Sequence, residues 1–283
     1  KFDRNNQCFN QHLTVRLRMD FPQQMRSQGF GMPALRSIGA LVLREMSTRY
    51  GRSPGGYVWA LLQPLGIIIL LAFAFSLLQK SPSLGASFLL FKATGMLILQ
   101  IFNGLSNSVG QSLSYSKALL FYPRVSWLDA VLARFLLNTL VLLCVTIIIL
   151  FGIMIFEGIR TVIDWNQIIL AALMTTALGL GVGCINCYLF MRFPVWKNVW
   201  GIVTAPLFLI SGVIFLYEDL PLLAQEVLWY NPLIHLTGAM RDGFYPIYKP
   251  TYVSISYVGA WIFIPLVAGL LLLRQFNRDL INR

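Results

Sequence analysis

Six long apolar runs, almost free of charge, constrain this sequence more than any other feature. They are residues 57–78, 88–109, 135–156, 168–190, 199–217 and 253–273. Each run provides about the 20 mostly apolar residues that one α-helix needs to cross a bilayer, and Lys92 is the one charged residue among them. Because backbone groups in lipid must be satisfied internally, the runs predict an all-α membrane protein with six transmembrane helices.

Composition agrees with this class. Only 12% of the residues are charged, about half the share of a soluble domain. The first run is too long for the apolar region of a signal peptide and has no small-residue cleavage site, so we interpret it as a span. Cys184 and Cys187 form a C-x-x-C inside an apolar run with no neighbouring histidine. We therefore expect these cysteines to pack as small apolar residues and expect no metal site.

The formal net charge of +11 has a strong sidedness. With six spans, the termini share one side with the loops 110–134 and 191–198. That side holds most of the 22 lysines and arginines but fewer than half of the 11 acidic residues. Cationic loops stay in the cytoplasm, so we expect both termini there, in a multi-pass membrane protein. The positive charge then needs no nucleic-acid partner.

The residues before the first span divide into two parts. Residues 1–31 are polar without an apolar period, which predicts a cytoplasmic tail. Residues 32–52 carry an apolar stripe at helical spacing, which predicts an amphipathic helix in the membrane surface. An ordinary helix packed on protein is the alternative. Residues 53–283 form the transmembrane domain.

A short polar turn connects this helix to the first span. Two cations are followed by helix-breaking residues and then by two aromatic residues. The residues of the turn are Arg49, Arg52, Pro54 and Gly56, and the aromatic residues are Tyr57 and Trp59. We expect the cations to hold the cytoplasmic interface and the aromatic side chains to anchor the helix that enters the membrane.

Two further segments are too apolar for ordinary loops. Residues 112–124 predict a short cytoplasmic helix that ends near Pro123 and offers an apolar face to a partner protein, or else lies on its own bundle. Residues 218–250 hold four prolines between apolar pieces too short to span. Such pieces predict re-entrant or interfacial helices on the outer side, next to a pore mouth.

The sequence has no energy source of its own. No G-x-x-x-x-G-K-[ST] motif occurs, so the chain does not bind ATP through a P-loop. Ion-driven carriers usually bury ionisable groups at mid-membrane, and five of the six runs have none. We interpret Lys92, near the outer end of its span, as a snorkelling side chain, with a pore-lining cation as the alternative. His235 and Asp242 are the one pairing that resembles an acid/base couple.

Two motifs resemble a known family. The stretch "REMSTRYGRSPGGYVWALLQPL" (44–65) resembles the entry signature of type-2 ABC exporter permeases, particularly those that export capsular polysaccharide in Gram-negative bacteria. The stretch "YNPLIHLTGAMRDGFYPIY" (230–248) is similar to the segment before the last span of that family. The resemblance covers nearly the whole chain. One departure is Pro54-Gly55-Gly56, where relatives usually have a Leu-Gly pair.

The resemblance implies a transport subunit, not an enzyme. A homodimer of this chain would assemble with two P-loop ATPase subunits, which bind the ATP and Mg, and would move a lipid-linked acidic polysaccharide into the periplasm through a channel between protomers. Periplasmic and outer-membrane export proteins are further expected partners. The short helix predicted at residues 112–124 would be the coupling helix that docks on the ATPase. Its contact residues would be Ser112, Tyr115, Lys117, Leu120, Tyr122 and Arg124. The residues expected to contact polymer or channel are Tyr57, Trp59, Lys92, Tyr217, Trp229, Tyr230 and Arg241.

Three other functions stay open on the sequence. An O-antigen or teichoic-acid exporter permease would have the same fold, as would an exporter of drugs or small lipids. A membrane-embedded glycosyl- or acyltransferase belongs to a different class. It would need indispensable acid/base residues, for which His235 and Asp242 are the candidates.

Overall fold

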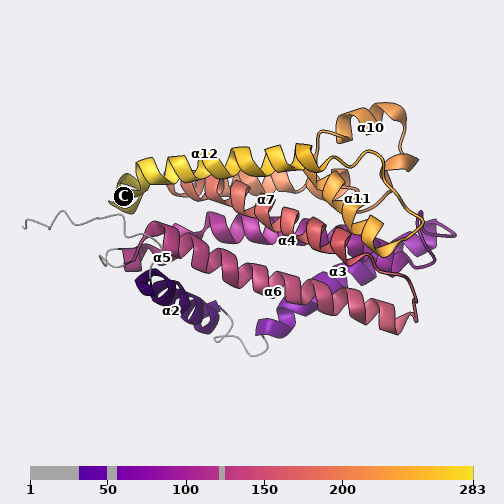
Figure 1. The fold of residues 1–283 in the computed structure, drawn as a ribbon, viewed down its shortest axis with the longest axis horizontal. Helices are drawn as coiled ribbons and strands as arrows, with labels where there is room; N and C mark the ends of the chain where they lie inside the picture. The colour runs from indigo at the N-terminus through magenta and orange to yellow at the C-terminus, as the bar shows by residue number, and fades with distance from the viewer. Residues whose placement is uncertain (1–31, 50–55, 121–124, 283) are drawn as a thin grey trace, which may run out of the picture.

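A computed structural model describes residues 32–49, 56–120 and 125–282 of the chain, with the side chains of 37–46, 58–120 and 125–276. All regular elements in these ranges are helices (Figure 1). Five of the described helices are long and apolar enough to cross a membrane. They are α3 (Gly56–Leu78), α4 (Phe88–Gly110), α6 (Trp127–Phe156), α7 (Trp165–Arg192) and α12 (Ile255–Asn282). The helical class and five of the six predicted runs are therefore confirmed.

Helix α4 lies at the centre of the bundle. It packs against α3, α6 and α7 and also against α11 (Pro232–Phe244), while α12 packs on the far side of α7 (Figure 1). Side chains such as Ile98 and Leu105 are fully buried. α3 and α12 are the least buried of the spanning helices. Their outer faces are apolar, as the lipid-facing side of a membrane bundle should be.

Side-chain caps fix where three of these helices begin. Ser87 accepts a hydrogen bond from the Leu90 amide at the start of α4. Ser126 and Asp129 form a capping box at the start of α6, and Asp164 caps α7. Each cap satisfies amide groups that have no partner within the helix.

Glycines bring α7 close to its two neighbours. A Cβ atom on Gly183 would lie 2.7 Å from Val109 Cβ of α4. On α12, a Cβ atom on Gly269 would lie 2.6 Å from Cys184 Cβ and 2.8 Å from the Ile185 nitrogen. Small residues allow this close backbone approach, which stabilises helix packing in membranes.

The predicted fifth span is not one helix. Residues 199–217 instead contain the end of α8 (Trp196–Thr204), then α9 (Leu207–Ile210), then irregular backbone. Pro206 lacks the amide hydrogen that a continuing helix needs, and its ring would clash with the Ile202 carbonyl. Gly212 has φ of +73°, a left-handed conformation that favours glycine. The prediction of a continuous helix is wrong because these two breakers lie inside an apolar run.

The broken segment still runs between the two ends of the bundle. Near its start, Lys197 Nζ lies 3.5 Å from Gln111 Oε1, and near its end Lys92 Nζ lies 2.6 Å from the Ile214 carbonyl oxygen. Gln111 and Lys92 lie at opposite ends of α4. At 1.5 Å per residue they are about 28 Å apart, close to the thickness of the hydrocarbon core.

Shorter helices gather at the two ends. At one end α2 (Met32–Arg49) packs on α6 near α5 (Ser112–Leu120); at the other lie η1 (Tyr217–Asp219), α10 (Leu222–Leu228) and α11 (Figure 1). The segments predicted as helices at 32–52 and near 112–124 are helical over their described parts, and their positions in the membrane surface and at a partner stay predictions. We call the first the α5 end and the second the α10 end.

The contact between α7 and α12 gives a stability test. We expect Gly269→Ala to lower the unfolding temperature of the purified protein, since the added methyl group overlaps backbone atoms and such overpacking costs about 1–3 kcal/mol. Gly259→Ala on the same helix is the control because nothing lies within 4 Å of its Cβ position. This change should stabilise α12 by about 0.5–1 kcal/mol. Equal unfolding temperatures for the two variants would contradict the packing.

Candidate functional site

Part of the predicted site lies outside the described side chains. Arg49 ends α2 and Gly56 begins α3, but the polar turn between them is not described. The predicted residues whose side chains are not described are Arg49, Arg52, Pro54, Gly56, Tyr57, Tyr122 and Arg124. Their roles stay predictions.

Helix α5 has one face on the bundle and one face in the open. Ser112, Leu113 and Leu120 are buried, and Ser112 Oγ lies 3.4 Å from Cys187 Sγ. Tyr115 is exposed. Among the predicted coupling residues, Ser112 and Leu120 therefore hold the helix in place, whereas Tyr115 and the half-buried Lys117 lie nearer the surface that a partner reaches.

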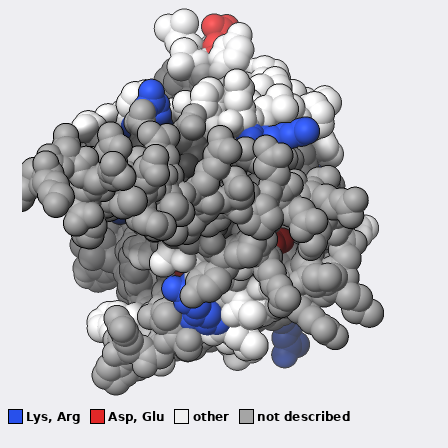
Figure 2. All heavy atoms as spheres, turned by 90° about the vertical axis from the view of Figure 1, so that its left-hand side faces the viewer, with Lys and Arg blue, Asp and Glu red and all other residues white. Residues whose placement is uncertain are grey.

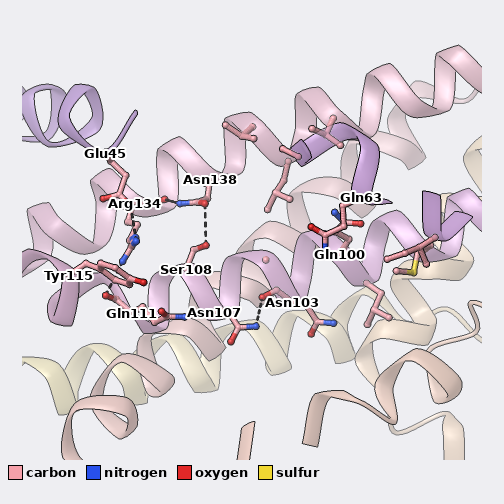
Figure 3. Close-up of a pocket in the computed structure, with 18 of the residues that line it drawn as sticks. Glu45, Gln63, Gln100, Asn103, Asn107, Ser108, Gln111, Tyr115, Arg134 and Asn138 are labelled. Carbon is pink, nitrogen blue, oxygen red and sulfur yellow. Dashed lines mark hydrogen bonds and ion pairs between the residues drawn. The ribbon is translucent and has the colours of Figure 1, made fainter. Parts of the chain in front are cut away.

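Arg134 of α6 connects three elements at the α5 end. Its Nη2 lies 2.7 Å from Glu45 Oε1 of α2, and its Nη1 donates to the Gln111 carbonyl oxygen over 2.9 Å. Its guanidinium carbon lies 4.3 Å from the centre of the Tyr115 ring of α5 (Figure 3). Both charged side chains are largely buried. Arg134 therefore joins α2 and α5 to the end of α4 through direct side-chain contacts.

Cations dominate the described charges at the α5 end. Figure 2 looks onto this end and shows Lys and Arg side chains at several places on the face. The described cations here, besides Arg134, are Arg44, Lys117, Arg192, Lys197 and Arg274, and the described acids are Glu45 and Asp129. The acids of the α10 end include Glu157, Asp164, Glu218, Asp219, Glu226 and Asp242. The charge difference expected from the sequence thus coincides with the two ends of the described bundle.

The predicted aromatic residues differ in exposure at the α10 end. Tyr217 is buried, stacks on Tyr252 with ring centres 4.0 Å apart, and donates to the Gln225 carbonyl. Burial raises the pKa of the Tyr252 hydroxyl to about 12, so it is neutral at physiological pH. Trp229 is half-buried, and Tyr230 is 68% exposed. Trp59 of α3 is also exposed, at 64%.

His235 and Asp242 do not form an acid/base couple. The His235 Nε2–H donates to the Trp229 carbonyl over 2.8 Å, and Nδ1 accepts from the Ser254 amide over 3.3 Å. Both ring nitrogens are thus occupied by backbone groups. Asp242 accepts a hydrogen bond from Lys249 at 2.6 Å, which raises the pKa of Lys249. This arrangement is structural and gives no support to a transferase.

Two buried cations hold the break in the fifth apolar run. Lys92 and Arg241 are each 1% exposed. Arg241 donates to the carbonyls of Gly212 and Phe215 over 2.6 and 3.1 Å, and Lys92 donates to that of Ile214. These carbonyls follow the end of α9 and have no helical amide partners there. The snorkelling interpretation of Lys92 is wrong, since its ammonium group points to the protein interior.

Aromatic rings complete the environment of both cations. Lys92 Nζ lies 3.8 Å from the centre of the Phe75 ring, and the Arg241 guanidinium carbon lies 4.0 Å from that of Phe91. Carbonyl oxygens and ring faces both favour a cation that has lost its water. Lys92, Arg241 and the carbonyls of residues 212–215 are called the cation clamp below.

A cavity of about 830 Å³ lies along α4, between the clamp and the α5 end. It is bounded by α2, α3, α4, α5 and α6 and extends along α4 from Met96 to Gln111. Those 16 residues span about 22 Å of helix, most of the hydrocarbon thickness. Its polar lining residues are Arg44, Glu45, Gln63, Gln100, Asn103, Asn107, Ser108, Gln111, Tyr115, Arg134 and Asn138.

Amide side chains form the central part of this lining. Gln100, Asn103, Asn107 and Gln111 follow one face of α4 at spacings of three and four residues. Figure 3 shows Gln63 of α3 and Gln100 pointing toward one another. The charged lining residues are confined to the α5 end, where Arg134 pairs with Glu45. A cavity of this length and polarity can accept an elongated molecule with many hydroxyl groups.

Most of the chain, including the residues of the clamp and the cavity, matches one protein family. Residues 36–245 match the ABC-2 type transporter family. The chain belongs to this family. It is 28% identical over 250 residues to the polysialic acid transport protein KpsM of Escherichia coli, covering 88% of this chain and 96% of the relative. The capsule polysaccharide export inner-membrane proteins CtrC of Neisseria meningitidis and BexB of Haemophilus influenzae are each 27% identical, over 86% and 91% of this chain.

Two features of this ABC-2 transporter chain are absent from the sequence predictions. The break at Pro206 was readable from proline and glycine inside an apolar run. The amide-lined cavity was readable from the spacing of Gln100, Asn103 and Asn107 on one helical face. The clamp itself has no local sequence signal, because Lys92 and Arg241 are 149 positions apart and both bind backbone atoms.

The clamp predicts how this ABC-2 chain responds to loss of Arg241. Arg241→Met should leave the carbonyls of Gly212 and Phe215 without donors, at a cost of about 1–3 kcal/mol each. We expect a lower unfolding temperature and faster proteolysis near residues 212–220. Lys249→Met, which removes an exposed cation from the same end, is the control and should have little effect. Identical behaviour of the two variants would contradict the clamp.

Proposed function

We propose that this chain is the membrane subunit of an ATP-driven exporter that moves lipid-linked, acidic capsular polysaccharide from the cytoplasm to the periplasm. The observation that carries the proposal is its similarity, over nearly their whole length, to proteins named for polysialic acid transport and capsule polysaccharide export. Membership in the ABC-2 family agrees with a transport role. The resting arrangement of His235 and Asp242 gives the enzyme alternative no support.

The energy comes from a separate ATPase in this proposal. The chain has no P-loop of its own, so two copies of a P-loop subunit bind ATP and Mg. We infer that they dock at the α5 end, on the open face of α5 beside Tyr115. The Arg134 contacts with Glu45 and Gln111 would carry their movement into α2 and α4.

The charge distribution supports a cytoplasmic α5 end. Cationic loops remain in the cytoplasm, and the described cations outnumber acids there. Together with the five long helices, the broken fifth segment gives six membrane crossings. Both termini therefore lie in the cytoplasm. α2 would then lie in the inner surface of the membrane, with the exposed Leu43 toward lipid.

The α10 end would form the outer mouth of the channel. α10 exposes Leu222 and Leu223, as expected for an interfacial helix, and α11 re-enters the bundle beside α4 and α7. The clamp residues Lys92 and Arg241 would hold the outer gate segment, residues 218–250, from inside the bundle. Trp229 and Tyr230 are the aromatic side chains at this end that remain available to stack on sugar rings, while the exposed Trp59 lies at the start of α3, away from the outer mouth.

A homodimer is the proposed assembly. α3 exposes Leu70 and Phe73, and α12 exposes Phe263 and Ile264. Each of these faces suits lipid or a second copy of the chain. The polymer would then move between the two protomers toward periplasmic and outer-membrane export proteins.

Docking of the ATPase gives the direct test of this function. The chain is co-expressed with a candidate P-loop ATPase subunit, purified, and placed in lipid vesicles. We expect co-purification, and ATP hydrolysis stimulated by lipid-linked acidic polysaccharide. Ala118→Arg, on the exposed face of α5, should reduce co-purification at least tenfold because a bulky cation enters the interface.

Asn198→Arg provides the matched control. It adds the same cation to another exposed position at the α5 end, on α8 and not on α5. Equal loss of the ATPase in both variants would place the docking surface elsewhere. Wild-type protein that binds no ATPase, or hydrolysis indifferent to the polymer, would contradict the proposed function.

A further inference from the structure

We propose that Gln63, Gln100, Asn103 and Asn107 form an amide ladder that binds the hydroxyl groups of successive sugar residues along α4. This inference rests on the proposed export function and assigns a binding surface within it. The ladder lines the cavity between α3, α4 and α6 of one protomer, and the proposal places this wall along the polymer path between protomers. It concerns recognition of the uncharged part of the polymer.

The first support is unmet hydrogen-bonding capacity. The buried oxygens Gln100 Oε1 and Asn103 Oδ1 have no hydrogen-bond partner in the described structure. Asn107 Nδ2 instead donates to the Asn103 carbonyl. An amide group at membrane depth without partners is unfavourable. Both side chains line the cavity. The two oxygens themselves are covered by protein in the described structure, so the proposal requires the amides to turn toward a ligand that enters the cavity.

Other polar groups of the same region are already satisfied. Asn138 Nδ2 donates to the Arg134 carbonyl over 2.7 Å, and its Oδ1 accepts from Ser108 over 3.1 Å (Figure 3). This pair joins α4 to α6 in the way that polar residues join membrane helices. Gln100 and Asn103 make no such interhelical bond among those described, so helix association does not account for them.

The two walls of the cavity suit a sugar ring. The α4 wall presents amides, and the α6 wall presents Val141, Leu142 and Val145. A pyranose has polar hydroxyls at its edge and apolar C–H groups on its faces. Amides both donate and accept hydrogen bonds, as hydroxyl groups do. The walls are therefore complementary to a sugar chain that lies along the groove with its hydroxyl edge toward α4.

Because the ladder residues carry no charge, we expect them to bind the hydroxyl groups of the polymer and not its carboxylates. The charged lining residues lie at the α5 end of the cavity, where Glu45 and Arg134 form an ion pair. The polymer's carboxylates thus meet no cation among the ladder residues. Several weak and equivalent sites allow a chain to bind and yet move on, as conduction through a pore requires.

The test uses the complex of this chain with its ATPase in lipid vesicles. The double variant Gln100→Met/Asn103→Leu removes the two unpartnered oxygens with little change in volume. We expect the polymer concentration for half-maximal stimulation of ATP hydrolysis to rise about tenfold, since each lost hydrogen bond weakens binding severalfold. Gln79→Leu, which removes an exposed amide outside the cavity, is the control.

Two additional measurements separate ligand binding from a structural role. The unfolding temperature of the double variant should stay equal or rise, because unpartnered polar atoms are replaced by apolar ones. A carboxyl-reduced, neutral polymer should show the same tenfold shift, since the ladder binds hydroxyls. Gln63→Met serves as the second variant and should shift the half-maximal concentration in the same direction.

Each contrary result has a distinct meaning. If the wild-type complex responds to polymer and the double variant responds equally, the ladder is wrong and the export function stands. If the variant separates into monomers in light scattering, these amides belong to a protomer interface and the inference is overturned. If the wild-type complex ignores the polymer, the proposed export function itself is contradicted.

Discussion

The requirement that every backbone group in the membrane finds a partner shapes this structure more than any other constraint. Five helices meet it almost entirely by their own hydrogen bonds, apart from the positions where Pro64 of α3 and Pro265 of α12 lack an amide hydrogen. The fifth apolar run does not, because Pro206 and Gly212 interrupt it. Lys92 and Arg241 supply donors to the carbonyls of residues 212–215. Two buried cations thereby allow irregular backbone at membrane depth, where it is otherwise not tolerated.

The position of the outer segment depends on this clamp. Arg241 belongs to α11 and Lys92 to α4, so the same contacts that satisfy residues 212–215 also join α11 to the central helix. The Tyr217–Tyr252 stack lies immediately beyond the clamp. At the other end of α4, Gln111 accepts from Arg134 through its carbonyl oxygen. α4 therefore connects the Arg134 contacts to the outer segment, with the amide-lined cavity between them.

The sequence predicted features that depend on local pattern. Apolar length identified five spans, an apolar stripe at helical spacing indicated α2, and apolar composition before a proline indicated α5, over their described parts. The unbroken fifth span was wrong because hydropathy averages over proline and glycine. The interpretation of Lys92 was wrong because its distance from the helix end does not reveal that residues 212–215 cover its side chain. Contacts such as Lys92 with Ile214 join distant residues, and only the folded arrangement supplies them.

The amide-lined cavity shows the same limit of prediction from sequence. The polar residues of α4 are visible in the sequence, but hydrogen-bonding helix contacts and ligand contacts use the same residue types. Asn138 proved to be of the first kind, since Ser108 and the Arg134 carbonyl satisfy it. Gln100 and Asn103 differ only in having buried oxygens without partners. That difference depends on three-dimensional packing.

Direct measurement of transport tests the central claim most sharply. Fluorescently labelled lipid-linked polysaccharide is added outside vesicles that contain this chain and its ATPase with the α5 end outward, and its arrival in the lumen is followed. The account predicts accumulation that requires ATP, the ATPase and this chain together. Arrival without ATP, or no arrival while the assembled complex hydrolyses ATP, would contradict it.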